Sequence, residues 1–216
     1  MAAPPKTSHP RKRLSAVDRR ATILESALEV FSKRGYNGAS IDEIATAAGI
    51  SKALIYEHFP SKRDLHASLL EENVQVIFMR LAQTADTDDP GEVRLRNGVN
   101  AFFEWAETNR DAFRLLFRDT FESDVADVLN RLQNQATGAI AALMASEAPQ
   151  GDRRRREPDS ALAIEAMAQQ LSGAAQSLAI WWQQHPDLDR EWLVDRVMDY
   201  AWIGLERVRA GERASR

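Results

Sequence analysis

The chain has 216 residues, a formal net charge of −4 and no cysteine, which excludes disulfides and thiolate metal sites. No apolar run approaches the ~18 residues of a membrane-spanning helix, and no apolar segment follows the basic residues near the N-terminus. We therefore expect a cytoplasmic protein that has no membrane partner and buries its core without covalent cross-links.

The charged residues are divided unevenly along the chain. Up to Arg63 there are eleven Lys and Arg against six Asp and Glu, whereas the remainder has seventeen against twenty-six. A basic N-terminal part on an acidic body is expected where only one end of a protein meets phosphate groups.

Residues 1–14 contain three prolines and a basic cluster at residues 11–13, but no apolar period. This composition predicts a disordered basic arm. The arm is either a solvated tail or a segment that contacts DNA phosphates or the minor groove, and the sequence leaves both interpretations open.

The next segments have the periodicity and the end signals of helices. Apolar residues recur at helical spacing from residue 18 to Gly35, where the glycine is expected to stop the helix. Ser40 and Glu43 form a capping-box pattern at the start of a second helix, and Ser51 is placed to cap a third. Pro60 ends that helix, and a fourth helix is predicted for residues 62–85.

The remaining sequence also has helical periodicity, and it lacks the sustained alternation typical of strands. A polar, arginine-rich loop is expected at residues 149–158. The further helices are expected at residues 92–108, 111–121, 124–145, 160–184 and 190–209. The predicted fold class is all-α.

Residues 40–59 carry the pattern of a helix-turn-helix. Ala45 is small at the position where two short helices would cross, and Gly49 follows four residues later at the turn. Ile50 and Ile55 are then expected to point back into a small core. Because such a unit places its second helix in the major groove, the segment predicts DNA binding.

Two stretches resemble the TetR/AcrR family of regulators: residues 20–36 (RATILESALEVFSKRGY) and residues 40–62 (SIDEIATAAGISKALIYEHFPSK). The resemblance covers about residues 18–70. It implies a helix-turn-helix DNA-binding domain at residues 15–75 and a larger helical domain for ligand binding and dimerisation at residues 76–216. It also implies a homodimer that binds a palindromic DNA operator, responds to a small and largely apolar inducer, and acts as a repressor without a cofactor.

The resemblance also assigns residues to the contact with DNA. Lys52, Ala53 and Leu54 open the recognition helix, where base contacts are made. The full set expected at DNA is Ser40, Ser51, Lys52, Ala53, Leu54, Tyr56, Glu57, His58 and Lys62. Ser51 could instead be only a helix cap, Tyr56 could merely cover the small core, and Lys52 and Lys62 could be solvated surface lysines.

Ala53 and Leu54 depart from the commonest family pattern, which has glycine and threonine at these positions. Leu54 lacks a hydrogen-bonding hydroxyl but could pack on a thymine methyl group. Glu57 could accept a hydrogen bond from a cytosine amino group. The resemblance therefore does not predict the operator sequence.

The body contains candidate residues for a ligand pocket and for a dimer interface. Aromatic residues gathered in a short stretch predict an apolar pocket lined by Phe102, Phe103, Trp105, Phe113, Phe117, Phe121 and Trp181. Small and apolar residues on the last two helices predict an interface between subunits formed by Ala174, Ala175, Leu178, Val194, Met198, Trp202 and Leu205. Ordinary packing in the core of one subunit is the alternative for both sets.

Catalysis and metal binding are not expected. The sequence has no phosphate-binding glycine loop and no nucleophile elbow, and its four histidines lack the spacing of metal ligands. The remaining alternative is a helical small-molecule-binding or adaptor protein without specific DNA binding, and the basic N-terminal region counts against it.

Overall fold

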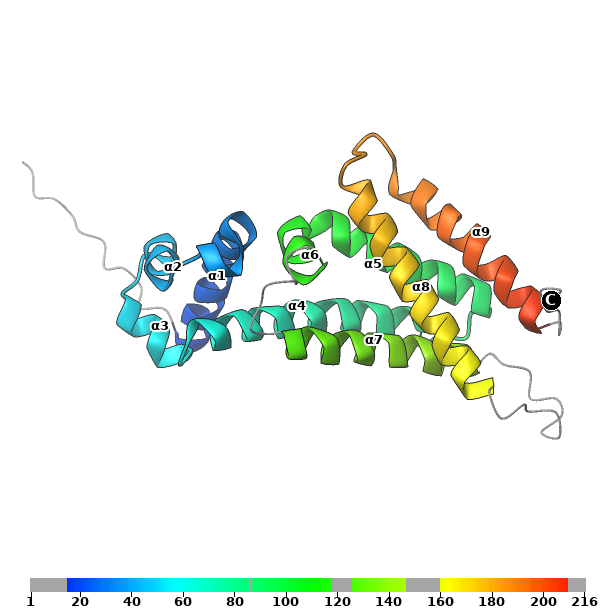
Figure 1. Cartoon of the computed structure of the whole chain (residues 1–216), viewed down its shortest axis with the longest axis horizontal. Helices are drawn as coiled ribbons and strands as arrows, with labels where there is room; N and C mark the ends of the chain where they lie inside the picture. The colour runs from blue at the N-terminus through cyan, green and yellow to red at the C-terminus, as the bar shows by residue number, and fades with distance from the viewer. Residues whose placement is uncertain (1–14, 86, 118–125, 147–159, 210–216) are drawn as a thin grey trace, which may run out of the picture.

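The computed structural model describes residues 15–85, 87–117, 126–146 and 160–209, and α-helix is the only regular secondary structure within them (Figure 1). The predicted all-α class is confirmed. The helices are α1 (Ala16–Gly38), α2 (Ile41–Ala48), α3 (Lys52–His58), α4 (Lys62–Ala85), α5 (Gly91–Thr108), α6 (Arg110–Phe117), α7 (Ala126–Ser146), α8 (Ser160–Trp182) and α9 (Arg190–Arg209). None of the helices, as far as they are described, has an apolar stretch long enough to cross a bilayer.

Helices α1, α2 and α3 form a small unit at one end of an elongated molecule, and α4 runs from this unit into the body (Figure 1). Along the body, α4 packs against α5 and α7, α8 packs against α7, and α9 packs against α5. Helix α6 contacts α1, so the small unit touches the body at a second place besides α4. The domain boundary at residue 75 stays a prediction, because α4 passes through it without a break.

Local end signals account for the boundaries of the first helices. Helix α4 spans the predicted residues, and at its start the Ser61 Oγ accepts a hydrogen bond from the Asp64 N–H at 3.1 Å. Helix α1 differs from the prediction, because Gly35 (φ 68°) kinks the helix and one further turn continues to Gly38. The Ala39 N–H then donates to the Gly35 carbonyl at 3.2 Å and closes that turn.

The core of the small unit takes one face from each of its helices and from the start of α4. Its fully buried apolar residues are Ile23, Ala27, Phe31, Ile44, Ile55 and Leu65. Ala45 is also buried, and Ile50 packs half-buried against the same core, as predicted. Burial of an aliphatic side chain contributes about 1.5–3 kcal/mol, so Ile55 alone supplies much of the attachment of the short helix α3.

Candidate nucleic-acid interface

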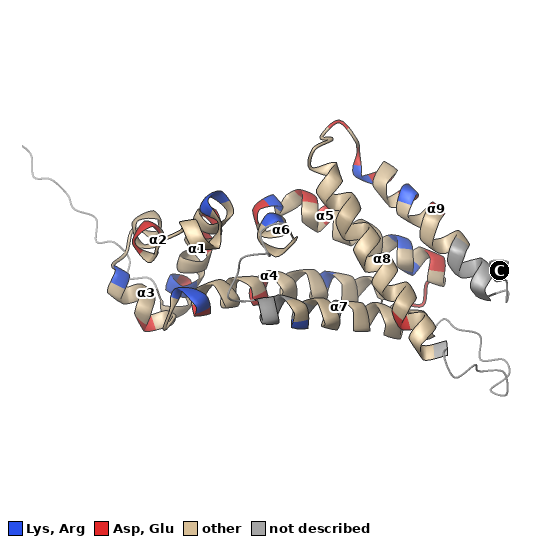
Figure 2. Cartoon of the chain, viewed as in Figure 1, with Lys and Arg blue, Asp and Glu red and all other residues tan. Residues whose placement is uncertain are grey.

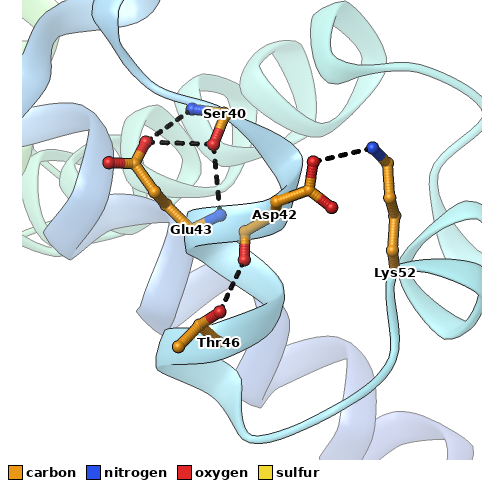
Figure 3. A network of polar contacts seen from close by, with 5 residues as sticks. All are labelled: Ser40, Asp42, Glu43, Thr46 and Lys52. Atoms are coloured by element: carbon orange, nitrogen blue, oxygen red, sulfur yellow. Dashed lines mark hydrogen bonds and ion pairs between the residues drawn. The ribbon is translucent and has the colours of Figure 1, made fainter.

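The N-terminus of α2 begins after Ser40, whose backbone and side chain are both engaged by Glu43 (Figure 3). The Ser40 Oγ accepts a hydrogen bond from the Glu43 N–H at 3.2 Å, and the Glu43 carboxylate accepts from the Ser40 N–H and hydroxyl, both at 3.0 Å. The predicted capping box is therefore present. It orders the first turn of α2, and it engages the hydroxyl of Ser40, one of the residues that the resemblance places at DNA.

The turn between α2 and α3 depends on the backbone of Gly49, which has φ 66° and ψ 31°. This left-handed conformation strains residues that carry a Cβ, although nothing lies within 4 Å of the Cβ position itself. The Gly49 N–H donates to the carbonyls of Ala45 and Thr46, and the Ile50 N–H donates to the Ala45 carbonyl at 3.0 Å. The turn thus satisfies carbonyls at the end of α2 and sets the direction in which α3 continues.

Helix α3 is attached by one side chain and exposes most of the others. Ile55 is fully buried, Leu54 and His58 are half-buried, and Tyr56 is 44% exposed. The other residues of the predicted set on this helix are exposed, namely Lys52, Ala53 and Glu57. The Ser51 Oγ accepts a hydrogen bond from the Leu54 N–H at 3.2 Å, so Ser51 caps the helix. The residues expected to read bases therefore share one short helix that is largely open to solvent.

Lys52 forms an ion pair with Asp42 across the turn, with Nζ and Oδ2 2.8 Å apart (Figure 3). The Thr46 hydroxyl donates to the Asp42 carbonyl at 2.8 Å within α2. The hydrogen bond to Asp42, and secondly its negative charge, raise the pKa of the Lys52 ammonium above its usual value. Sequence reasoning missed Asp42, because an acidic residue in the first turn of a helix is already explained by the helix dipole.

Lys62, at the start of α4, places its ammonium 4.5 Å from the centroid of the Tyr36 ring. That ring lies 4.8 Å from the His66 ring, which lies 4.7 Å from the Phe31 ring. His66 is 3% exposed, and its ring nitrogens have no hydrogen-bond partner among the described residues. Burial, and secondly the charge of Lys62, lower the pKa of His66 to about 4. Sequence reasoning missed this contact because a tyrosine beyond a glycine and a lone histidine both look like ordinary packing residues.

The charge at this end of the molecule is mixed rather than uniformly basic (Figure 2). Residues 15–63 hold seven Lys and Arg against six Asp and Glu, so most of the basic excess counted in the sequence belongs to residues 1–14. Those residues, and with them the expected contact of the arm with DNA, lie outside the described part of the chain. Within the described part, α1 to α4 carry a few Lys and Arg side chains, some held in defined positions by their neighbours, instead of a broad positively charged surface.

Most of the predicted pocket residues form a packed aromatic cluster on α5 and α6. Phe103, Trp105 and Phe113 are buried, and the rings of Phe113 and Phe117 lie 4.9 Å apart. The Phe102 ring lies 5.5 Å from the Phe103 ring and 6.3 Å from the rings of Phe113 and Phe117. The structure brings these residues together with their rings in contact, and the ligand pocket that they are expected to line stays a prediction.

Trp181 does not belong to this aromatic cluster, which corrects its assignment. It is 39% exposed, and its ring stacks on His185 with 3.9 Å between centroids. Its neighbour Trp182 is buried, with its ring 6.0 Å from that of Phe103. Adjacent helical positions point about 100° apart, so only one of the two tryptophans faces inward. Phe121 lies outside the described residues.

A cleft of about 370 Å³ opens between α1, α4 and α7. It is lined by polar and charged residues, namely Arg20, Ser68, Glu71, Glu72, Gln75, Arg131 and Gln135. Its chemistry differs from the apolar pocket that the sequence predicts. No group of three or more His, Asp or Glu in the described residues is placed to hold a metal ion.

The predicted interface residues are divided between the core of the chain and its surface. Val194 and Met198 of α9 and Ala175 of α8 are buried in the chain's own core, because α9 packs on α5 and α8. Side chains enclosed in one subunit offer no surface to another, so the interface assignment of these three is corrected. The half-buried members are Ala174, Leu178 and Trp202, and the side chain of Leu205 lies outside the described part. The exposed large apolar residues on α8 and α9 are Leu162, Trp181, Trp192, Tyr200 and Ile203.

The fold, with an exposed α3 joined to α2 by a glycine turn, is that of a helix-turn-helix regulator with a helical body. Residues 23–69 match the family model of bacterial regulatory proteins of the tetR family, and residues 91–204 match that of the tetracyclin repressor-like C-terminal domain. The chain belongs to the TetR family of DNA-binding transcriptional regulators.

Relatives of the chain are regulators as well. It is 31% identical to the transcriptional activator FasR of Mycolicibacterium smegmatis over 198 residues, which are 91% of this chain and 87% of the relative. It is 30% identical to the regulator EthR of Mycobacterium tuberculosis over 154 residues, which are 70% of this chain and 71% of the relative. The solved structure of FadR from Bacillus subtilis in complex with stearoyl-CoA has the same fold, with a TM-score of 0.69, 17% identity, and 89% and 99% of the two chains covered.

Proposed function

We propose that two copies of the chain bind a palindromic operator, with one α3 helix in each of two successive major grooves, roughly 34–36 Å apart. The observation that carries this proposal is that Ile55 is the only buried residue of α3. A short helix is marginal by itself and packs little of its surface on its own chain, which favours a DNA groove as its partner.

The exposed residues of this region are proposed to have two roles. Contacts with base edges are assigned to Lys52, Ala53, Leu54 and Glu57. Contacts with phosphates are assigned to Ser40, Tyr56, His58 and Lys62. Phosphate contacts position the protein on the duplex, whereas base contacts select the sequence.

A second copy of the chain is proposed to cover the exposed apolar side chains of α8 and α9. Tyr200 and Ile203 are 63% and 53% exposed, and the rings of Trp181 and Trp192 lie 6.3 Å apart near the turn between the two helices. Exposed apolar residues gathered on neighbouring helices mark interaction surfaces more often than isolated ones do. A twofold contact covers the same residues on both copies and places two α3 helices on one DNA.

A small and largely apolar ligand is proposed to bind in the body beside the aromatic cluster of α5 and α6. The stearoyl-CoA in the FadR structure supports a ligand with an apolar part. Because α6 contacts both α1 and α4, a ligand that moves α6 would change the spacing of the two α3 helices. We propose that the dimer represses promoters that its operator overlaps and that the ligand relieves this repression.

Selection of genomic fragments by the purified protein tests the DNA-binding proposal. We expect sequence-selective retention that weakens linearly with the logarithm of salt concentration. Absence of selective retention would favour a helical ligand-binding protein without specific DNA binding. Transcription in vitro from a selected promoter then gives the direction of control, and an increase in transcript would replace repression by activation, the activity named for the FasR relative.

Sedimentation of a variant tests the dimer interface. Tyr200→Glu should convert the dimer to a monomer and weaken operator binding, because it places a charge on the proposed contact. Val93→Glu, at a 40% exposed apolar position on α5, is the matched control and should remain dimeric. A Tyr200→Glu protein that sediments as a dimer would place the interface elsewhere.

A further inference from the structure

Lys62 is held in a different way from the other described lysines. Its ammonium lies 4.5 Å from the centroid of the Tyr36 ring, and the ion pairs of the described residues give it no carboxylate partner. Lys33 is paired with a glutamate at 2.7 Å, and Lys52 is paired with Asp42 at 2.8 Å. Lys62 is therefore oriented by an aromatic face while its positive charge stays uncompensated.

The Tyr36 ring is itself held by its neighbours. It lies 4.8 Å from the buried His66 ring of α4 and 6.0 Å from the fully buried Phe31 ring of α1. Burial lowers the pKa of His66 to about 4, so at neutral pH this histidine adds no second positive charge beside Lys62. The ring that carries the ammonium is therefore part of the packing between α1 and α4.

We propose that Tyr36 is a positioning residue that holds Lys62 ready for a DNA phosphate without neutralising it, an inference that rests on the proposed DNA binding. The face of an aromatic ring attracts an ammonium through its quadrupole. A ring takes up little of the hydrogen-bonding capacity of the three ammonium N–H donors, which remain for phosphate oxygens. A carboxylate in the same place would order the side chain equally well but would cancel the charge that attracts the phosphate.

The expected effect follows from the flexibility of lysine. Immobilising such a side chain at an interface weakens binding by about two- to tenfold, and a side chain that is already oriented avoids this loss. Tyr36→Leu, which keeps apolar bulk but removes the ring, should weaken operator binding by that factor. It should leave the slope of affinity against salt nearly unchanged, whereas Lys62→Ala should flatten the slope by about one because it removes a phosphate contact.

The coupling between the two residues is measured with four proteins: the wild type, Tyr36→Leu, Lys62→Ala and the double variant. If Tyr36 acts through Lys62, its substitution has no further effect on affinity once Lys62 is alanine. Tyr36→Phe retains the ring face and should restore most of the affinity that Tyr36→Leu loses. Thermal unfolding of each protein shows whether a loss of affinity comes from a loss of folded protein.

A spectroscopic signal tests the contact without DNA. The chain has only five lysines, at positions 6, 12, 33, 52 and 62, so protein labelled with ¹³C at lysine Cε gives few signals. The Lys62 signal, assigned by its absence in Lys62→Ala, should be shifted upfield by the ring in the wild type and in Tyr36→Phe. It should return to the position of a solvated lysine in Tyr36→Leu.

The outcomes separate this inference from the function on which it rests. Wild-type protein that binds no DNA contradicts the proposed function, and the inference falls with it even if the ring shift is present. DNA binding with no ring shift at Lys62 overturns the inference alone. An equal loss of affinity from Tyr36→Leu in the wild-type and Lys62→Ala backgrounds also overturns it, because Tyr36 would then act independently of Lys62.

Discussion

Lowering the pH from 7 to 5 should destabilise the protein through His66, whose side chain is 3% exposed between α1 and α4. Burial lowers the pKa of His66 from 6.5 to about 4 in the folded chain. The unfolded chain, in which the pKa is near its ordinary value, therefore takes up the proton first as the pH falls. The contribution of neutral His66 to stability is complete above pH ~6.5 and is lost as the pH falls toward 4.

The size of the loss follows from the two pKa values. For one group that titrates near 6.5 when unfolded and near 4 when folded, the free energy of unfolding falls by about 2 kcal/mol at pH 5 and about 3 kcal/mol at pH 4. The first cause is that burial removes the His66 ring from water, with no hydrogen bond from a described residue in exchange, and the second is that the charge of Lys62 opposes another positive charge. A loss of this size is a substantial part of the 5–15 kcal/mol that is typical of folded proteins.

Urea unfolding of the wild type and of His66→Leu at pH 7 and pH 5 measures this contribution. Protein concentration is kept fixed because the unfolding of the proposed dimer would depend on concentration. The packing cost of replacing the ring is present at both pH values and cancels in the difference between them. The wild type should lose about 2 kcal/mol more than His66→Leu between pH 7 and pH 5. Equal losses in the two proteins would refute the argument that His66 is buried in its neutral form.

Three further predictions concern the helix-turn-helix. Gly49→Ala should lower the free energy of unfolding by about 1–2 kcal/mol, because Gly49 has a positive φ. Gly138→Ala, inside α7 with open space at its Cβ, is the control in the same denaturant-unfolding assay and should be neutral or stabilising by up to about 1 kcal/mol. Asp42→Asn should strengthen binding to non-specific DNA and steepen the dependence of affinity on salt by about one, because it frees Lys52 of α3 from its ion pair. Glu29→Gln, which breaks an ion pair on α1, is the control, and equal effects of both variants would contradict a role of Asp42 at the DNA contact. Leu54→Thr should change the preferred base at one operator position and leave the salt slope unaltered, as measured by selection from random DNA; an unchanged preference would remove Leu54 from the base-reading set.

Helix boundaries were largely predictable because their signals are local. The Ser40 capping box, the Ser51 cap and the left-handed Gly49 turn are all present, since each depends only on residues within a few positions of itself. The kink at Gly35 was predicted as a helix end, because the sequence shows where a helix is interrupted but not whether it resumes.

The body was less predictable because its helices are apolar on more than one face. Periodicity placed Val194 and Met198 together on one face of α9, but it could not show that this face packs on α5 instead of on a second subunit. It likewise gave no reason to prefer Trp181, which was assigned to the pocket, over the adjacent Trp182, which is the buried one of the two. Only the packing of the other helices decides which face of a largely apolar helix is enclosed.

The sequence by itself determined the helical class, the helix-turn-helix and the residues that α3 exposes to solvent. Helix caps, turns and apolar periodicity each depend on residues that are close together in the sequence. The tertiary structure decided which side chain contacts each lysine of the site: Asp42 forms an ion pair with Lys52, and the face of the Tyr36 ring contacts the ammonium of Lys62. These partners are ten or more residues apart and come from different helices. The distances in space between these side chains are set by the angles at which the helices pack, and those angles depend on the whole core.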